Sequence, residues 1–302
     1  MKAIMKSLLN KVPYVRGLYE QTANTNKNSF YPAGHYYSPI VSVEDIRRRE
    51  KEIWKDAGVD GIKGIRLNTE AQIALATELS RYYSEMPFTQ HKQDGRRYWF
   101  ENNFYSYTDG IVLYSMIRHF RPQRIIEVGS GYSSALMMDV NEIFFNNRIN
   151  LNFIEPYPDR LYSLMTENDR PHITVLEKPV QDVDPGLFEK LEKGDILFID
   201  SSHVSKCASD VNFILFEILP VLKSGVLIHF HDVFYPFEYP KDWVFSGWNW
   251  NEDYFLKAFL MYNNAFNIKF FSNYLHVHHK ESFSAMPLSY RNTGGNFWIE
   301  KN

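Results

Sequence analysis

The chain has 302 residues, a formal net charge of −3, and hydrophobic side chains at 44% of its positions. This composition supplies enough apolar surface for a full core, which excludes disordered and fibrous proteins. Basic residues are spread along the sequence and form no patch that would hold phosphates. A nucleic-acid partner is therefore excluded, and a small molecule or glycan is the expected substrate.

Residues 1–103 predict an N-terminal cap made mainly of helices and loops. Strand signals are sparse there, and helical patterns occur near 43–55 and 68–85. The basic and apolar residues at the very start are typical of a helix packed on the body, and they leave open a peripheral contact with a membrane surface. No apolar run is long enough to span a bilayer, and Cys207 has no cysteine partner, so we expect a cytoplasmic protein.

From residue 104 onward, helical and strand patterns alternate, which predicts an α/β domain with a Rossmann-like, mostly parallel sheet of seven strands. The predicted helices cover residues 104–120, 133–145, 206–222 and 250–263. The predicted strands cover residues 124–128, 149–155, 172–178, 195–200, 226–232, 265–271 and 295–300. This second domain runs from 104 to 302.

A glycine-rich turn, E-V-G-S-G-Y-S-S at residues 127–134, follows the first of these strands and opens a helix. Glycines there allow a tight turn and a close approach to a ligand, and the helix start offers free N–H groups. Ser134 stands where a dinucleotide site would have glycine or alanine, which disfavours NAD and FAD. Glu155 ends the second strand, where it can accept hydrogen bonds from ribose hydroxyls. Glu127 suits a positively charged ligand that has no phosphate.

These residues resemble class I S-adenosylmethionine-dependent methyltransferases: E-V-G-S-G-Y-S-S is similar to their motif I and F-I-E-P to their second motif. The resemblance covers roughly residues 104–302 and implies S-adenosylmethionine as cofactor. It implies a cofactor site made by a strand end, the glycine turn and later strand ends: Glu127, Gly129, Ser130, Gly131, Tyr132, Ser133, Glu155, Asp182, Asp200 and Ser201. Within this set Glu155 would hold the ribose and Asp182 would lie near the adenine. Ser133 replaces the third glycine of the family motif.

Two polar clusters follow the fourth and fifth strands, D-S-S-H at 200–203 and H-F-H-D at 229–232. Ligands of open α/β sheets bind outside the carboxyl ends of the strands, so the two clusters should face one cleft. We predict His231, Asp200 and His203 as catalytic residues, with His231 taking a proton from the acceptor hydroxyl. His229 is expected to be a packing residue, and D-S-S-H alternatively caps the next helix.

The segments IDSSH and SGVLIHFHDVFYPFEYPKDW resemble a bacterial subgroup of these methyltransferases, associated with glycan and antibiotic biosynthesis and distantly similar to macrocin and catechol O-methyltransferases. In the distant relatives, acidic residues after the fourth and fifth strands hold magnesium. The resemblance thus gives Asp200, His231 and Asp232 as candidate ligands of a divalent metal. An imidazole would suit manganese, iron or zinc better than magnesium.

The sequence therefore predicts O-methylation of a hydroxyl on a sugar, glycan or secondary metabolite, as in polysaccharide biosynthesis. A nicotinamide oxidoreductase and a non-catalytic binding protein that keeps the fold remain the alternatives, and a homo-oligomer is left open. The aromatic loop at 233–250 predicts a wall for the acceptor, with Tyr235, Tyr239, Trp243 and Trp248 available for stacking, or else a packed loop core.

Overall fold

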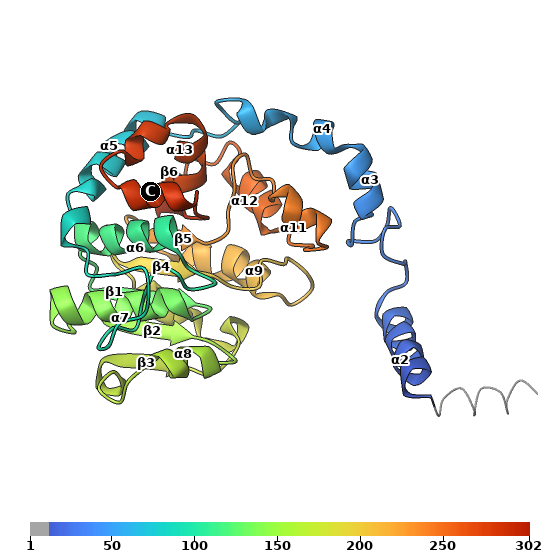
Figure 1. Cartoon of the computed structure of the whole chain (residues 1–302), viewed down its shortest axis with the longest axis horizontal. Coiled ribbons are helices and arrows are strands. Elements are labelled where there is room, and N and C mark those ends of the chain that lie inside the picture. Colours follow the sequence, from blue (N-terminus) through green and yellow to red (C-terminus); the bar gives the residue numbers. More distant parts are fainter. Residues whose placement is uncertain (1–11) are drawn as a thin grey trace, which may run out of the picture. The chain divides into compact units, whose positions relative to one another are not determined.

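The computed structural model describes residues 12–302, which form two compact units (Figure 1). Unit 1 comprises Met1–Lys55 and Pro240–Asn249, and unit 2 comprises Asp56–Tyr239 and Trp250–Asn302. The residues from 56 to 103 belong to the unit that carries the sheet, so the compact units differ from the division predicted at residue 103. The basic start of the chain, with its predicted membrane contact, lies mostly outside the described residues.

Unit 1 contains four α-helices among its described residues: α2 (Pro13–Asn28), α3 (Val43–Arg48), α4 (Glu50–Ile53) and α11 (Lys241–Phe245). The inserted segment with α11 packs on the N-terminal helices of the same unit. The Arg47 guanidinium lies 4.2 Å from the centre of the Phe245 ring, and Lys241 Nζ lies 2.7 Å from Glu50 Oε1. This unit therefore joins two segments that are far apart in the sequence.

Unit 2 is built around a seven-stranded sheet of order β3-β2-β1-β4-β5-β7-β6. The strands are β1 (Arg124–Val128), β2 (Asn150–Ile154), β3 (Ile173–Leu176), β4 (Ile196–Ile199), β5 (Leu227–Phe230), β6 (Phe266–Phe271) and β7 (Phe297–Lys301). The first five are parallel, and β7 runs antiparallel to both β5 and β6. This confirms the predicted Rossmann-like sheet, whose parallel strands place the ends of β1, β2, β4 and β5 at one edge.

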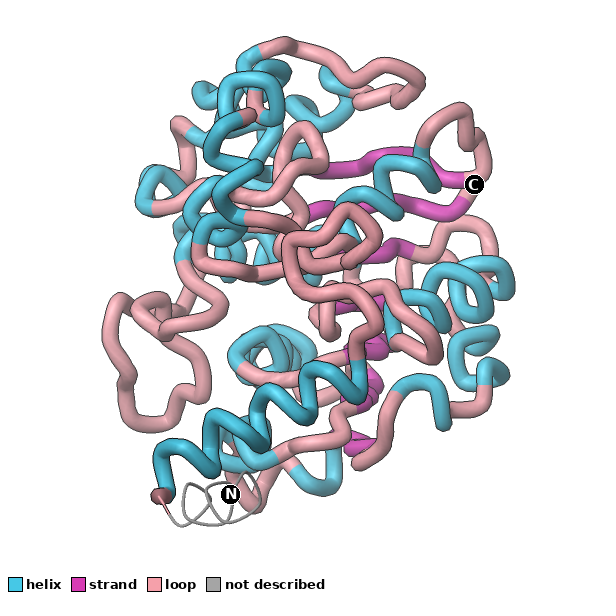
Figure 2. Tube along the Cα trace, turned by 90° about the vertical axis from the view of Figure 1, so that its right-hand side faces the viewer, coloured by secondary structure: helices cyan, strands magenta, loops and turns pink. Residues whose placement is uncertain are grey.

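Helices cover both faces of the sheet, as parallel strands require (Figure 2). The helices of unit 2 are α5 (Thr69–Ser80), α6 (Tyr107–Phe120), α7 (Tyr132–Phe145), α8 (Asp159–Leu164), α9 (Asp210–Phe213), α10 (Leu219–Val221), α12 (Glu252–Leu260) and α13 (Ser272–His278). Because α6 packs against both α5 and α7, these three helices form one layer.

The continuous helix predicted over 206–222 is wrong in two respects. Ser209 caps the helix start, since its Oγ accepts a hydrogen bond from the N–H of Asn212, so α9 begins only at Asp210. A π-helical turn at Ile214–Ile218 then separates α9 from α10. Pro220 lies in α10 and cannot donate a backbone hydrogen bond, which is incompatible with an unbroken α-helix.

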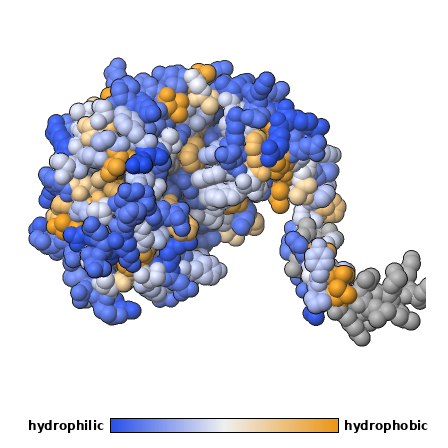
Figure 3. All heavy atoms as spheres, viewed as in Figure 1, coloured by the Kyte–Doolittle hydropathy of each residue, from blue (hydrophilic) through white to orange (hydrophobic). Residues whose placement is uncertain are grey.

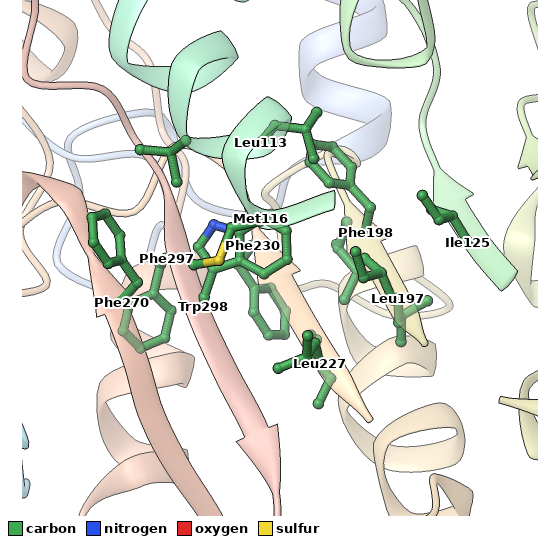
Figure 4. Packing of buried hydrophobic residues seen from close by; sticks show 14 of the residues in the cluster. Leu113, Met116, Ile125, Leu197, Phe198, Leu227, Phe230, Phe270, Phe297 and Trp298 are labelled. Carbon is green, nitrogen blue, oxygen red and sulfur yellow. The ribbon is translucent and has the colours of Figure 1, made fainter. Parts of the chain in front are cut away.

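The core lies between the sheet and its helices, with aromatic side chains at its centre (Figure 4). Trp298 and Phe297 from β7 and Phe230 from β5 are completely buried beside Met116 of α6. In the view of Figure 3 the surface is mostly hydrophilic, with small hydrophobic patches. Among residues 12–302, no helix combines the length and the apolar character that crossing a membrane requires.

Candidate functional site

A pocket of about 510 Å³ opens at the carboxyl ends of β1, β2 and β4, within unit 2. Its walls include Gly129, Glu155, Asp200 and Ser201, four of the residues predicted to bind the cofactor. The volume lies in the range that small-molecule and cofactor sites occupy. The predicted glycine turn, ribose acid and reactive carboxylate therefore meet in one cavity.

Gly129 is required by a close approach of two chain segments. Its φ is +82°, and a Cβ at this position would lie 1.8 Å from the carbonyl oxygen of Asp200. Only glycine avoids both the left-handed strain and this clash. The turn is thereby pressed against the end of β4, which brings the Asp200 loop to this pocket.

Glu155 holds the glycine turn in place through backbone hydrogen bonds. Its two oxygens accept from the N–H groups of Ser130 (3.0 Å) and Tyr157 (2.8 Å), and its side chain is partly exposed in the pocket. The hydroxyls of Ser130 and Ser201 are buried without a hydrogen-bond partner among the described residues. Such orphan groups beside the pocket fit a ligand that carries hydroxyls and a carboxylate.

Glu127 lies beneath the turn and does not line the pocket. It is completely buried, and its carboxyl group accepts hydrogen bonds from the hydroxyls of Ser133 (2.5 Å) and Ser134. Burial raises the pKa of Glu127 to about 8, even though the two serine hydroxyls favour its ionised form. In this arrangement Glu127 fastens the start of α7, and the contact with a positive ligand stays a prediction.

The other predicted cofactor residues are placed around the pocket rather than in its wall. The Tyr132 ring packs edge-on against Trp99, with ring centres 5.1 Å apart. Asp182 ends a short 3-10 turn whose first two residues, Val180 and Gln181, line the pocket. This end of the pocket therefore carries apolar and amide groups, and a direct role for Asp182 beside an adenine stays a prediction.

The predicted catalytic residues form a chain of alternating carboxylates and imidazoles. Asp200 Oδ1 lies 3.3 Å from Nδ1 of His231 and 3.4 Å from Nε2 of His203. His203 Nδ1 lies 2.9 Å from Glu252 Oε2, and His231 Nε2 lies 3.7 Å from Asp109 Oδ1. Asp200 is the member that reaches the pocket, with 32% of its side chain exposed against 5% or less for either imidazole.

The carboxylates and imidazoles of this row stabilise the charged forms of one another. Removal from water disfavours the ionised form of Asp200, but the imidazoles of His231 and His203 lower its pKa well below the ordinary value. Burial also opposes the charged form of His203, yet Asp200 and Glu252 raise its pKa to about 10. Burial lowers the pKa of His231 as well, but the neighbouring carboxylates, chiefly Asp232 and Asp200, have the larger effect and raise this pKa well above its usual range. The surrounding carboxylates therefore favour the protonated form of both imidazoles.

The sequence does not predict Asp109 and Glu252 as site residues, although both are buried beside the imidazoles. Asp109 is the only charged residue in the apolar part of α6, which was the available signal. Glu252 looks like an ordinary acid in the first turn of α12, so nothing local distinguishes it from a helix-terminal charge. Their contacts depend on tertiary packing.

The candidate metal ligands Asp200, His231 and Asp232 do not form a cation site in this structure. Among residues 12–302, no three or more His, Cys, Asp or Glu side chains converge in a way that could hold a metal ion. The donor atoms of Asp200 and Asp232 face the His231 ring instead, at 3.3 and 3.7 Å. In this arrangement the two carboxylates pair with the imidazole, and a divalent metal held by these three residues stays a prediction.

Two further predictions have clear outcomes. His229 is a packing residue, as expected: it is completely buried and stacks on Phe198 at 4.1 Å between ring centres. Tyr235 is not available for stacking on an acceptor, because it is buried and its hydroxyl bonds to the backbone at Val59 and Gly61. Tyr239 is also buried, so the alternative of a packed loop core is correct for both tyrosines.

Comparison with known proteins finds a relative and a matching domain family. An uncharacterised protein of Archaeoglobus fulgidus is 31% identical over 201 residues, which cover 65% of this chain and 89% of the relative. Residues 126–233, from β1 to the segment after β5, match the family model described as a methyltransferase domain. This segment of the chain therefore carries a methyltransferase domain.

Two solved structures have partial likeness to this chain. A CmcI chain, described with magnesium and S-adenosylmethionine, is 17% identical with a TM-score of 0.42, covering 74% of this chain and 84% of its own. The O-methyltransferase TomG of Streptomyces achromogenes, involved in tomaymycin synthesis, is 13% identical with a TM-score of 0.40. That likeness covers 86% of this chain and 99% of TomG.

Proposed function

We propose that this protein transfers the methyl group of S-adenosylmethionine to a hydroxyl group of a sugar, a glycan or a small secondary metabolite. The observation that carries the proposal is the pocket in which Gly129, Glu155 and Asp200 meet at the carboxyl edge of the sheet. In a methyltransferase domain, this edge is where an adenosyl ligand is expected, with Glu155 facing the ribose.

The reaction requires positioning and removal of one proton. The cofactor supplies an activated methyl group: its S–CH₃ bond breaks, an O–CH₃ bond forms on the acceptor, and S-adenosylhomocysteine and a methyl ether result. The acceptor's hydroxyl proton passes to a base of the protein. Among the predicted catalytic residues, Asp200 is the carboxylate that lines the pocket, and the two imidazoles beside it favour its ionised form.

The sequence assigns proton uptake to His231, and the geometry adds a condition to this assignment. Both ring nitrogens of His231 face carboxylates, and its side chain is 5% exposed. His231 can therefore take up the acceptor's proton, directly or through Asp200, only after it has lost a proton of its own. Substituting alanine for His231 should slow transfer by about 10²-fold and leave cofactor affinity nearly unchanged.

Calorimetry with S-adenosylmethionine, S-adenosylhomocysteine and NAD tests the proposal. We expect binding of the first two and none of NAD, because the ionised carboxylate of Asp200, next to the glycine turn, would repel a pyrophosphate bound there. Tight binding of NAD alone would instead support a nicotinamide oxidoreductase. Binding of S-adenosylmethionine without methyl uptake by any acceptor would support a non-catalytic binding protein.

The acceptor class is tested by methyl uptake from labelled S-adenosylmethionine. Nucleotide sugars, glycan fragments and small phenols are the compounds to compare, since they present hydroxyls in different surroundings. The variant Glu155→Ala serves as the control for cofactor use. We expect it to weaken S-adenosylmethionine binding by about 1 to 3 kcal/mol, because the ribose would lose a charged hydrogen-bond acceptor.

A further inference from the structure

Glu252, the first residue of α12, contacts an imidazole that lies 49 positions earlier in the sequence. Its Oε2 is 2.9 Å from Nδ1 of His203, and both side chains are buried. The other carboxylate oxygen, Oε1, makes no hydrogen bond to the described residues. A buried carboxylate is costly unless it is paired, so the contact with His203 is what offsets the burial of this group.

The backbone that precedes α12 holds the same histidine. The carbonyl oxygen of His203 accepts hydrogen bonds from the N–H groups of Asn251 (3.0 Å) and Glu252 (3.2 Å). The ring centres of Trp250 and His203 are 4.2 Å apart. His203 itself has a φ of +58°, a left-handed conformation that costs free energy and persists only where the surroundings enforce it.

This arrangement decides which ring nitrogen of His203 faces Asp200. Because Nδ1 is turned to Glu252, Nε2 points to Oδ1 of Asp200 at 3.4 Å. A carboxylate bound to one nitrogen of an imidazole fixes the ring orientation and the proton on that nitrogen, and it thereby controls the other nitrogen.

Asp109 lies beside His231 as Glu252 lies beside His203, but its contacts are weaker evidence that it orients the imidazole. Its Oδ1 lies 3.7 Å from His231 Nε2 and also accepts hydrogen bonds from Gly295 N (2.8 Å) and Asn296 Nδ2 (3.0 Å). These hydrogen bonds hold the end of the loop before β7, and this structural role is enough to explain why Asp109 is buried there. Glu252 has no such second task among the described residues.

We infer that Glu252 is a positioning residue that orients His203, so that its Nε2 edge supports Asp200 at the cofactor pocket. The inference rests on the proposed methyl transfer, in which Asp200 and His203 take part. Glu252 does not line the pocket, so it acts only through His203. Its removal should slow the transfer and leave cofactor binding intact.

The test compares Glu252→Ala and Glu252→Gln with Asp253→Asn in the full chain. Asp253 is the matched control, since it is the next residue, is completely buried, and accepts a hydrogen bond from the Phe234 N–H (3.2 Å) instead of contacting His203. Glu252→Gln keeps an acceptor oxygen and nearly the same volume. It serves as the near-isosteric variant if the alanine protein does not fold.

The first readout is the Nδ1–H signal of His203 in protein labelled with ¹⁵N-histidine and saturated with S-adenosylhomocysteine. A His203→Gln variant assigns the signal. We expect a protected Nδ1–H signal in the wild type and in Asp253→Asn, a shifted signal in Glu252→Gln, and none in Glu252→Ala. The second readout is turnover with an acceptor from the methyl-uptake screen, where Glu252→Ala should lower kcat by about 10²-fold with the KM for S-adenosylmethionine nearly unchanged.

A Glu252→Ala or Glu252→Gln protein that keeps the wild-type His203 signal and the turnover of Asp253→Asn would overturn the inference. Failure of the proposed function has a different signature. In that case calorimetry shows no S-adenosylmethionine binding by the wild type, while the His203 signal in the ligand-free protein still reports whether Glu252 orients the ring.

Discussion

The two glycines of the turn have different physical tasks although they stand two positions apart. Gly129 is in the left-handed region and touches the Asp200 carbonyl, whereas Gly131 has an extended φ of 176°. A Cβ at Gly131 would meet only Cδ of the flexible Arg160 side chain, at 3.2 Å. Gly129 is therefore needed by the fold itself, and Gly131 leaves space at the start of α7.

This difference predicts opposite outcomes for two alanine substitutions. Gly129→Ala should lower the free energy of unfolding by about 3 kcal/mol or more, because it adds left-handed strain to a backbone clash. Gly131→Ala should fold with a loss of less than about 1 kcal/mol. Urea unfolding followed by circular dichroism measures both. Equal stability of the two variants would show that Asp200 does not press on the turn.

Glu127 predicts a pH dependence of stability. Its pKa rises from an unfolded value near 4.5 to about 8 in the folded protein, so the folded state binds the proton more tightly. The associated stability is complete below about pH 4.5 and is lost as the pH rises to about 8. Relative to Glu127→Gln, the wild type should lose about 3 to 5 kcal/mol of unfolding free energy across this window.

Urea unfolding of both proteins at half-unit pH steps measures the difference. The comparison with Glu127→Gln removes the contributions of other titrating groups, since both proteins share them. Parallel curves for the two proteins from pH 4.5 to 8 would mean that Glu127 is ionised in the folded state. The carboxylate would then be free to contact a cationic ligand.

At the scale of elements, the sequence predicts well whatever depends on local pattern. The apolar runs ILFI and LIHF identify β4 and β5, and the strand predictions agree with the structure to within about two residues at either end. The predicted helix at 206–222 fails because Ser209 and Pro220 set boundaries that apolar periodicity does not register. Local pattern also assigns Gly129, Glu155 and Asp200 to one edge, where the structure brings them together.

Contacts between distant segments are what the sequence does not disclose. Ser134 counts as a departure from the dinucleotide pattern, yet its hydroxyl donates to Glu127 and accepts from the Gly131 N–H (3.0 Å). Glu252 meets His203 only because α12 returns to the end of β4. A side chain of ordinary type at an ordinary position becomes a site residue through packing, and no spacing rule anticipates it.

Arg97 illustrates such a contact between elements. The guanidinium is buried and reaches Asp139 of α7 at 2.7 Å and Asp169 at 2.9 Å, joining the segment before α6 to α7 and to the turn before β3. Arg97→Ala would leave two buried carboxylates without their cation. We expect it to lower the free energy of unfolding by about 3 to 5 kcal/mol.

The control for Arg97 is Arg81→Ala. Arg81 pairs with Glu78 at 2.7 Å on an exposed helix end, where an ion pair contributes less than about 1 kcal/mol. Thermal or urea unfolding of the two variants makes the comparison. A small loss at Arg97, similar to that at Arg81, would mean that solvent reaches the Arg97 cluster. In that event α7 would not depend on this contact for its position.

At the scale of the whole molecule, the cofactor pocket belongs to unit 2 alone. Every residue in its wall lies between Val128 and Asp210, and unit 1 contributes none. Ligand binding stabilises only the states that contain the intact site, by about 2.7 kcal/mol at a hundredfold excess over Kd. We therefore expect ligand binding to stabilise the part of unit 2 that surrounds the pocket and to leave unit 1 unchanged.

Hydrogen exchange of the full chain with and without S-adenosylmethionine tests this expectation. Amides at 128–135, 154–157, 179–181 and 200–210 should exchange up to about a hundredfold more slowly, because opening them requires loss of the ligand. Amides at 12–55 and 240–249 should change little. Cys207 offers an independent measure, since this exposed thiol lies between Lys206 and Ala208 in the pocket wall and should react more slowly with a thiol reagent when the ligand is bound. Protection confined to unit 1, with Cys207 labelled at its original rate, would locate the ligand away from Glu155 and Asp200.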